Sequence, residues 1–172
     1  GDATYVGYFN FVRSTYEYTK PEDAKTDNQK VATQRALLNT NFRKGFLYGF
    51  KVEEYLKLVN EFSPLQYLMR GYTIKELCAA DGKDYVDYVT EVFNKKQGTT
   101  GVSLYGIENG SDPVYNAGKA TEFFNTAKAE LKAAGLTDAD FPIRIDVIGD
   151  MDVENQAFEK TAYATIEAAS QG

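Results

Sequence analysis

The sequence predicts an α/β fold in which helices pack on a small mixed sheet. One observation behind this class is a series of amphipathic stretches with apolar residues at three- and four-residue steps, most clearly in residues 39–60 and 117–134. The other is a pair of stretches, residues 5–12 and 141–148, that are rich in β-branched and aromatic residues and lack a helical period. The chain closes with a helix, a strand and a helix, which is typical of half an α/β unit.

The composition indicates one globular domain covering residues 1–172. With 172 residues and 43% apolar content, the chain is long enough for one real core. It contains no apolar run of the length that a membrane-spanning helix requires. It opens directly in a strand-like stretch and closes at Ser170–Gly172, which is typical of a piece excised from a longer chain. The net charge of −6, with scattered Lys and Arg, argues against a nucleic-acid partner.

Four parts are expected to follow one another along this domain. A strand that crosses between parts of the fold is expected at about residues 4–12, and a helical region at residues 28–96. Residues 97–116 are rich in Gly, Ser, Asn and Thr, and they predict a long loop. Residues 117–170 predict the closing helix, strand and helix.

Local signals place the individual helices. The periodic stretches predict helices at residues 29–38, 42–49, 51–60, 85–94, 117–134 and 153–169, with a shorter one at 74–79. Asp27 or Asn28 is expected to cap the first of them, and Asn39-Thr40-Asn41 to end it and cap the second. Gly135 stands where the C-terminal turn of a helix favours glycine.

The residue types that catalysis needs are largely missing. The sequence has no histidine, which removes the commonest general base and metal ligand, and a single cysteine excludes a multi-cysteine metal site. Cys78 stands between Leu77 and Ala79, and this setting indicates a small buried apolar residue rather than a nucleophile. No phosphate-binding glycine loop or nucleophile elbow is present. We therefore expect neither an enzyme nor a cofactor.

A weak calcium pattern near the last helix fails on two positions. Asp150, Asp152 and Glu154 resemble the first ligands of a calcium loop. Asn155 stands where that loop needs glycine, and Thr161 where it needs a bidentate glutamate. The carboxylates are better explained by the positive N-terminal end of the last helix. No metal site is expected.

Arg43 is the one charged residue that stands out in an apolar helical face. Its stem can cover apolar surface while its guanidinium reaches water or a carboxylate. Alternatively, the side chain is buried and ties its helix to a neighbouring strand. Both interpretations make Arg43 a structural residue.

Three segments, in their order and spacing, carry a family resemblance. They are Tyr5–Asn10, Leu37–Phe50, and the stretch Tyr115–Leu136 followed by Phe141-Pro142-Ile143-Arg144-Ile145. Together they resemble the oligopeptide-binding proteins of ABC importers, the family 5 class of extracellular solute-binding proteins. In that family a strand ends in asparagine, a later helix opens with Phe-Arg or Val-Arg, and an Ala-Gly helix end leads into a strand opening Phe-Pro. Gly45 and Gly49 depart from the family, since they stand where alanines are usual.

The resemblance implies a fold and a function. It implies part of one lobe of a two-lobe fold of the type II periplasmic-binding-protein kind. The function would be that of the substrate-binding component of an ABC transporter, which binds extracellular oligopeptides for uptake. Its partners would be oligopeptides and, through the full-length protein, the ABC permease subunits. Its location would be the extracellular face of the cell membrane, as a lipid-anchored lipoprotein of Gram-positive type. The alternative from another class is a stand-alone protein–protein interaction domain on the cell surface.

The same resemblance selects the residues expected to meet ligand. The strand that crosses between the lobes is the part nearest the binding groove, and it contains Tyr5, Tyr8 and Asn10. The two tyrosines would offer a ring and a hydroxyl to an extended peptide, or would instead pack the hinge between the lobes.

Overall fold

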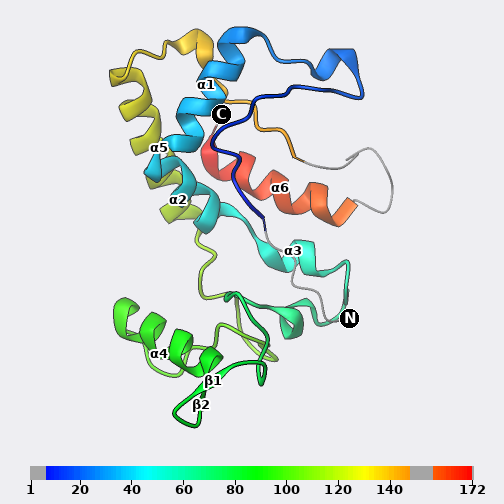
Figure 1. The fold of residues 1–172 in the computed structure, drawn as a ribbon, viewed down its shortest axis with the longest axis vertical. Helices are drawn as coiled ribbons and strands as arrows, with labels where there is room; N and C mark the ends of the chain where they lie inside the picture. Colours follow the sequence, from blue (N-terminus) through cyan, green and yellow to red (C-terminus); the bar gives the residue numbers. More distant parts are fainter. Residues whose placement is uncertain (1–6, 148–156, 172) are drawn as a thin grey trace.

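The computed structural model describes residues 7–147 and 157–171. Figure 1 shows a layer of helices joined to a smaller part that carries a short hairpin. We call α1, α2, α5 and α6 the helical layer, and residues 59–112 the smaller part. The helices are α1 (Asp27–Leu38), α2 (Thr40–Gly49), α3 (Val52–Leu56), α4 (Tyr85–Gln97), α5 (Ala117–Ala133) and α6 (Ala157–Ser170), and the strands are β1 (Ala79–Ala80) and β2 (Lys83–Asp84). Short 3-10 turns occur at Pro21–Asp23, Pro64–Tyr67 and Asp138–Asp140.

Side-chain caps explain where the main helices begin. The Asn39 side chain accepts a hydrogen bond from the backbone N–H of Phe42 at 2.9 Å and so starts α2, as predicted. The cap predicted at Asp27 or Asn28 was wrong: α1 starts earlier, because Thr26 and Gln29 form a reciprocal capping box. Gly135 ends α5 with a φ of 102°, as the sequence indicated.

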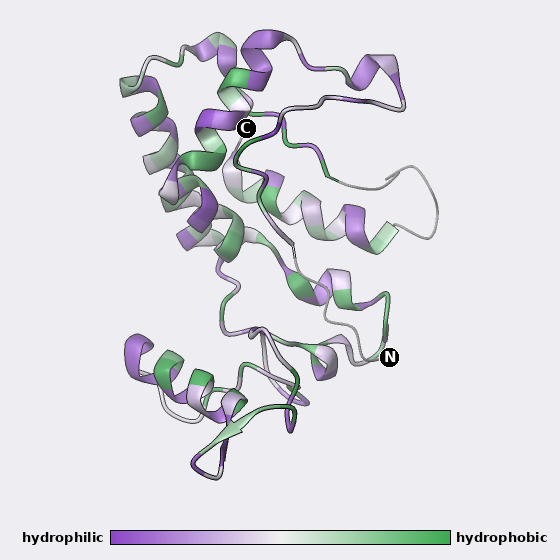
Figure 2. Cartoon of the chain, in the orientation of Figure 1, coloured by the Kyte–Doolittle hydropathy of each residue, from purple (hydrophilic) through white to green (hydrophobic). Residues whose placement is uncertain are grey.

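The core of the helical layer lies where α2 packs on α5 and α6. Phe42 and Phe124 are almost fully buried, and their rings meet edge to face with centroids 5.7 Å apart. A Cβ atom on Gly45 would lie 2.5 Å from the Phe124 ring, which is closer than van der Waals contact. The glycine therefore lets α2 approach α5 closely. Figure 2 shows hydrophobic residues recurring along α2 and α4.

Both long strands expected from the sequence differ in the structure. Residues 7–12 and 141–147 form no ladder with any described residue, and the described sheet is the two-stranded antiparallel hairpin of β1 and β2. A strand needs a neighbouring strand to pair with, and neither stretch has one here. The fold is therefore mostly helical with a small two-stranded sheet, and the helical layer packs on itself rather than on a mixed sheet.

The smaller part is ordered by its long loop. The backbone N–H groups of Arg70, Gly106 and Ile107 donate to the carbonyls of Leu104, Leu68 and Leu65 at 3.1, 3.0 and 2.8 Å. These bonds join the two sides of the part around buried leucines. The helix predicted at residues 74–79 was wrong: Glu76 has a φ of 68°, which interrupts a helix, and the chain turns here into β1.

Among the described residues, no helix has the length and apolar character needed to cross a membrane.

Candidate functional site

The predicted ligand-facing stretch runs along α2 with alternate side chains turned inward and outward. Phe9 packs against the core, and its ring meets that of Phe46 edge to face at 5.4 Å between centroids. Tyr8 is 83% exposed, and Asn10 is exposed as well. Asn10 accepts a hydrogen bond from the backbone N–H of Val12 at 3.1 Å, which fixes a local bend. Tyr8 and Asn10 thus lie on the outer side of an anchored segment, and Tyr5 lies outside the described residues.

Arg43 connects two helices of the helical layer to the segment that contains Asn10. Its guanidinium donates to the Leu37 carbonyl at 2.8 Å and to the Thr40 hydroxyl at 3.3 Å. It also lies over the ring of Phe11, with its central carbon 5.3 Å from the ring centroid. The side chain is half-buried. It therefore joins the end of α1 to α2 and reaches the segment that contains Asn10, although that segment is not a strand.

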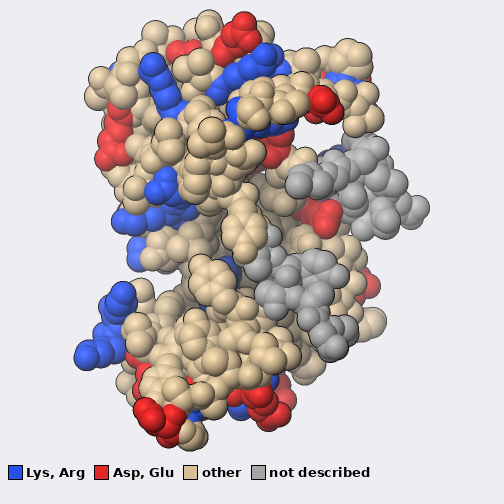
Figure 3. Space-filling model, in the orientation of Figure 1, with Lys and Arg blue, Asp and Glu red and all other residues tan. Residues whose placement is uncertain are grey.

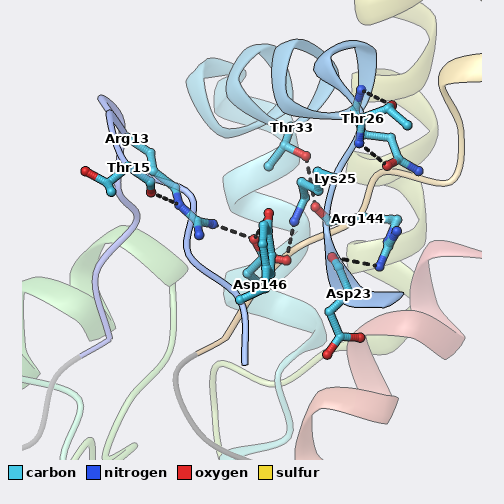
Figure 4. Close-up of polar contacts among 10 residues, drawn as sticks. Arg13, Thr15, Asp23, Lys25, Thr26, Thr33, Arg144 and Asp146 are labelled. Carbon is cyan, nitrogen blue, oxygen red and sulfur yellow. Dashed lines mark hydrogen bonds and ion pairs between the residues drawn. The ribbon is translucent and has the colours of Figure 1, made fainter. Parts of the chain in front are cut away.

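A polar cluster that the sequence did not predict holds the following segment in place. Figure 4 shows Arg13 and Lys25 converging on Asp146 from opposite sides, and each forms an ion pair with one carboxylate oxygen. The hydroxyl of Tyr18 donates to the same carboxylate at 3.2 Å. We call Arg13, Tyr18, Lys25 and Asp146 the Asp146 cluster. The Lys25 side chain is fully buried, so the ion pair offsets the cost of burying its ammonium group.

The cluster sets the ionisation of its central carboxylate. Partial burial alone would raise the pKa of Asp146, but the hydrogen bonds from Lys25 and Arg13 outweigh that effect and lower it. Burial, reinforced by the negative Asp146, raises the pKa of the Tyr18 hydroxyl. At neutral pH the cluster therefore holds a carboxylate between two cations. Through Arg13, it fixes the chain three residues beyond Asn10.

An apolar groove lies on the face of residues 141–147 that is opposite to the Asp146 side chain. It has a volume of about 390 Å³ and opens between residues 141–147 and the helices α2, α5 and α6. Its walls are mostly aromatic and aliphatic, with three charged residues and one serine: Phe42, Phe46, Phe124, Leu131, Phe141, Pro142, Ile143, Ile145, Val147, Tyr163, Ala164 and Ile166 with Lys128, Lys160, Glu167 and Ser170. Such a groove suits apolar side chains rather than a charged ligand.

A smaller hollow of about 270 Å³ separates the two parts of the molecule. It lies between Leu47 and Tyr48 of α2 and Phe93 and Leu104 of the smaller part. On the face drawn in Figure 3, uncharged surface covers much of the centre and the lower part, whereas Lys and Arg gather mostly toward the top and left.

The described residues hold no cluster of His, Cys, Asp and Glu that could bind a metal ion. Cys78 is exposed, and its expected burial was wrong because the turn into β1 carries it to the surface of the smaller part. Asp150, Asp152 and Glu154, the weak calcium pattern, lie outside the described residues.

Only part of the Asp146 cluster has a signal in the sequence. Arg144 and Asp146 alternate with Ile143 and Ile145, and this pattern indicates a stretch with one polar and one apolar side. The cations that meet Asp146 are more than 120 residues away along the chain, since the Lys25 bond spans 121 residues. Sequence spacing could not identify them.

Known proteins align with most of this chain. It is 32% identical over 147 residues to the oligopeptide-binding protein AliA of Streptococcus pneumoniae, a match that covers 84% of the chain and 21% of AliA. The oligopeptide-binding protein AliB of the same species is 32% identical over 146 residues, 83% of the chain and 21% of AliB. The chain is homologous to a segment of oligopeptide-binding proteins. SarA of Streptococcus gordonii, also an oligopeptide-binding protein, is 29% identical over 152 residues, 84% of the chain and 21% of SarA.

This homology confirms the resemblance seen in the motifs, with a clear limit. The chain spans about a fifth of the length of these oligopeptide-binding proteins, since each match covers 21% of the relative. No protein-family model matches the sequence. The relatives are named for binding and not for a reaction.

Proposed function

We propose that this chain is a segment of the substrate-binding component of an ABC importer and takes part in binding extracellular oligopeptides. The carrying observation is the homology to oligopeptide-binding proteins over 84% of the chain. The function needs no chemistry, because binding of a peptide requires only a shaped surface with backbone and side-chain partners. The full-length protein would have two lobes, a lipid anchor on the extracellular face of the membrane, and a permease as its partner.

The segment from Tyr8 to Arg13 supports a contact with peptide. Its inward side is fixed by Phe9 on Phe46 and by Arg13 on Asp146. Its outward side presents the exposed Tyr8 and Asn10. An exposed tyrosine on a fixed backbone supplies contact area at a low entropic cost. Tyr5, also predicted to meet ligand, belongs to the same stretch of sequence.

The test is peptide binding by the complete reading frame that contains this chain. Calorimetry with a mixture of synthetic oligopeptides should show binding by the full-length polypeptide and at most very weak binding by the 172 residues alone. Micromolar or tighter binding by the 172 residues alone would contradict the assignment to one part of a larger groove. A reading frame no longer than the chain would sink the transport function and favour the stand-alone interaction domain.

Two substitutions locate the contact. In the full-length polypeptide, Tyr8→Ala should weaken peptide binding about tenfold, which corresponds to about 1.4 kcal/mol. Tyr72→Ala is the matched control, because Tyr72 is 77% exposed in the smaller part and should leave binding unchanged. Equal binding by both variants would assign Tyr8 to the hinge rather than to the ligand.

A further inference from the structure

Residues 141–147 have the side-chain contacts of a strand without a neighbouring strand. The odd-numbered residues Phe141, Ile143, Ile145 and Val147 all line the apolar groove. From residue 143 on, the even-numbered residues face the other way: Arg144 donates to the carbonyl of Asp23 at 3.4 Å, and Asp146 forms the ion pairs of its cluster. Pro142, at the start of the stretch, also lines the groove. Alternation with a period of two is the signature of extended β chain.

The backbone of this stretch has one partnered edge and one open edge. The hydroxyl of Thr33 in α1 donates to the Arg144 carbonyl at 2.9 Å. Among the described residues, no other hydrogen bond reaches the backbone of residues 142–147. In extended chain the backbone groups of successive residues point to opposite edges, so those of Ile143 and Ile145 point away from α1. Both residues are half-buried, where unpaired backbone groups are costly.

No described residue fills the groove beside this edge. Protein interiors are packed nearly as closely as organic crystals, with few voids larger than a water molecule. A groove of about 390 Å³ walled by Phe46, Phe124 and Ile166 is therefore an incomplete core. The open edge and the groove meet along Ile143 and Ile145, so one extended segment could pair with the edge and place its apolar side chains in the groove.

We propose that residues 141–147 and the apolar groove dock a β-strand from the same polypeptide, contributed by a part of it outside these 172 residues. The occupant depends on the proposed function, because the matched relatives are about five times as long as the region they share with this chain: each match covers 21% of the relative. A long apolar edge left open in a finished protein is a site for aggregation, so a permanent strand fits better than a ligand that leaves.

Amide hydrogen exchange tests this assignment directly. The amides of Ile143 and Ile145 should exchange about 100-fold more slowly in the full-length polypeptide, without added peptide, than in the isolated 172 residues. Equal rates in the two polypeptides would overturn the proposal. Slowing that occurs only after oligopeptide is added would identify the ligand as the occupant, and slowing that grows with the concentration of the isolated chain would identify a second copy. Either result would also overturn the proposal.

Peptide binding by the same sample separates the two levels of inference. Protected amides in a full-length polypeptide that binds no oligopeptide would leave the docked strand standing and refute the proposed function. Peptide binding by a full-length polypeptide whose Ile143 and Ile145 amides are unprotected would refute the docked strand and support the proposed function.

A pair of variants gives a second readout. Ile145→Pro removes the backbone N–H on the open edge, so it should lower the melting temperature of the full-length polypeptide by several degrees. In the isolated 172 residues the same change should have little effect, because this amide has no described hydrogen-bond partner to lose. Ile145→Val keeps the amide and most of the apolar volume, and it should be nearly neutral in both. An equal loss from Ile145→Pro in both polypeptides would overturn the docked strand.

Discussion

The helical layer and the smaller part are held together by different interactions. In the helical layer, the rings of Phe42, Phe46 and Phe124 meet within one continuous core. The smaller part buries Leu65, Leu68, Val86 and Leu104. It adds an ion pair between Arg70 and Asp112, whose carboxylate side chain is 3% exposed.

The two parts also differ in how many large apolar side chains they leave exposed to solvent. Phe62, Tyr72 and Leu77, all in the smaller part, are 94%, 77% and 69% exposed. The smaller part thus leaves more of its large apolar side chains exposed than the helical layer does. We conclude that the helical layer is held mainly by an apolar core, whereas the smaller part combines a few buried apolar residues with a buried ion pair.

The largest expected effect is the loss of the ring at the centre of the helical layer. Phe124→Ala should destabilise the isolated chain by about 3–5 kcal/mol, because it leaves a cavity between α2 and α5. Denaturant unfolding measures the change. Phe62→Ala is the matched control in the smaller part: this ring is 94% exposed, so its loss should change stability by less than about 0.5 kcal/mol. Similar losses from the two variants would contradict the contrast between the parts.

The second effect tests whether the smaller part depends on its ion pair. Asp112→Ala removes the partner of Arg70 and the acceptor of the Val114 N–H at 3.0 Å, and it should cost about 3 kcal/mol. Hydrogen exchange should rise at the loop bonds of the smaller part and stay unchanged in α2 and α5. Asp112→Asn retains an acceptor and should lose less. Faster exchange spread evenly over both parts would show that they unfold as one unit.

The third effect is a pH dependence of stability that comes from the Asp146 cluster. Asp146 has a lowered pKa in the folded chain, so its stabilising contribution is complete above its unfolded pKa of about 3.9 and is lost as the pH falls through the lower folded value. Asp146→Asn should cost about 2 kcal/mol at pH 7 and flatten the acid limb of the stability curve below about pH 4. Melting temperatures from pH 7 to pH 3 measure both.

The matched control for Asp146 is a carboxylate on the surface, Asp27. Asp27 pairs with Lys30 at 2.8 Å, but its side chain is 95% exposed, and Asp27→Asn should change the curve little. If the two variants gave the same curve, the Asp146 cluster would contribute no more to stability than the surface pair of Asp27 and Lys30.

The smallest expected effect concerns Arg43. Arg43→Ala removes its bonds to Leu37 and Thr40 and its contact with Phe11, and it should cost about 1 kcal/mol. In the full-length polypeptide it should lower the melting temperature far more than it weakens peptide binding. Arg43→Lys keeps the charge without the planar fork and should recover only part of the loss. A variant with normal stability and weakened peptide binding would instead make Arg43 a ligand contact.

Local signals predicted the helices and their limits well where capping residues are unambiguous. Asn39 starts α2 and Gly135 ends α5, as their side-chain chemistry requires. The alternation of Phe141, Ile143, Ile145 and Val147 also proved right, because these four side chains share the groove. Local sequence could not predict whether such a stretch becomes part of a sheet. It depends on a neighbouring strand that no residue within the stretch can supply.

The sequence by itself determined the helices, the two-sided character of residues 141–147, and the kinship with oligopeptide-binding proteins, because caps, periodicity and motif order are all written in short stretches of chain. The tertiary structure alone decided which distant groups meet. It brought Arg13 and Lys25 to Asp146, and it placed Phe9 on Phe46 so that Tyr8 faces outward. These contacts join residues far apart in the chain, and packing in three dimensions, rather than spacing along the sequence, selects them.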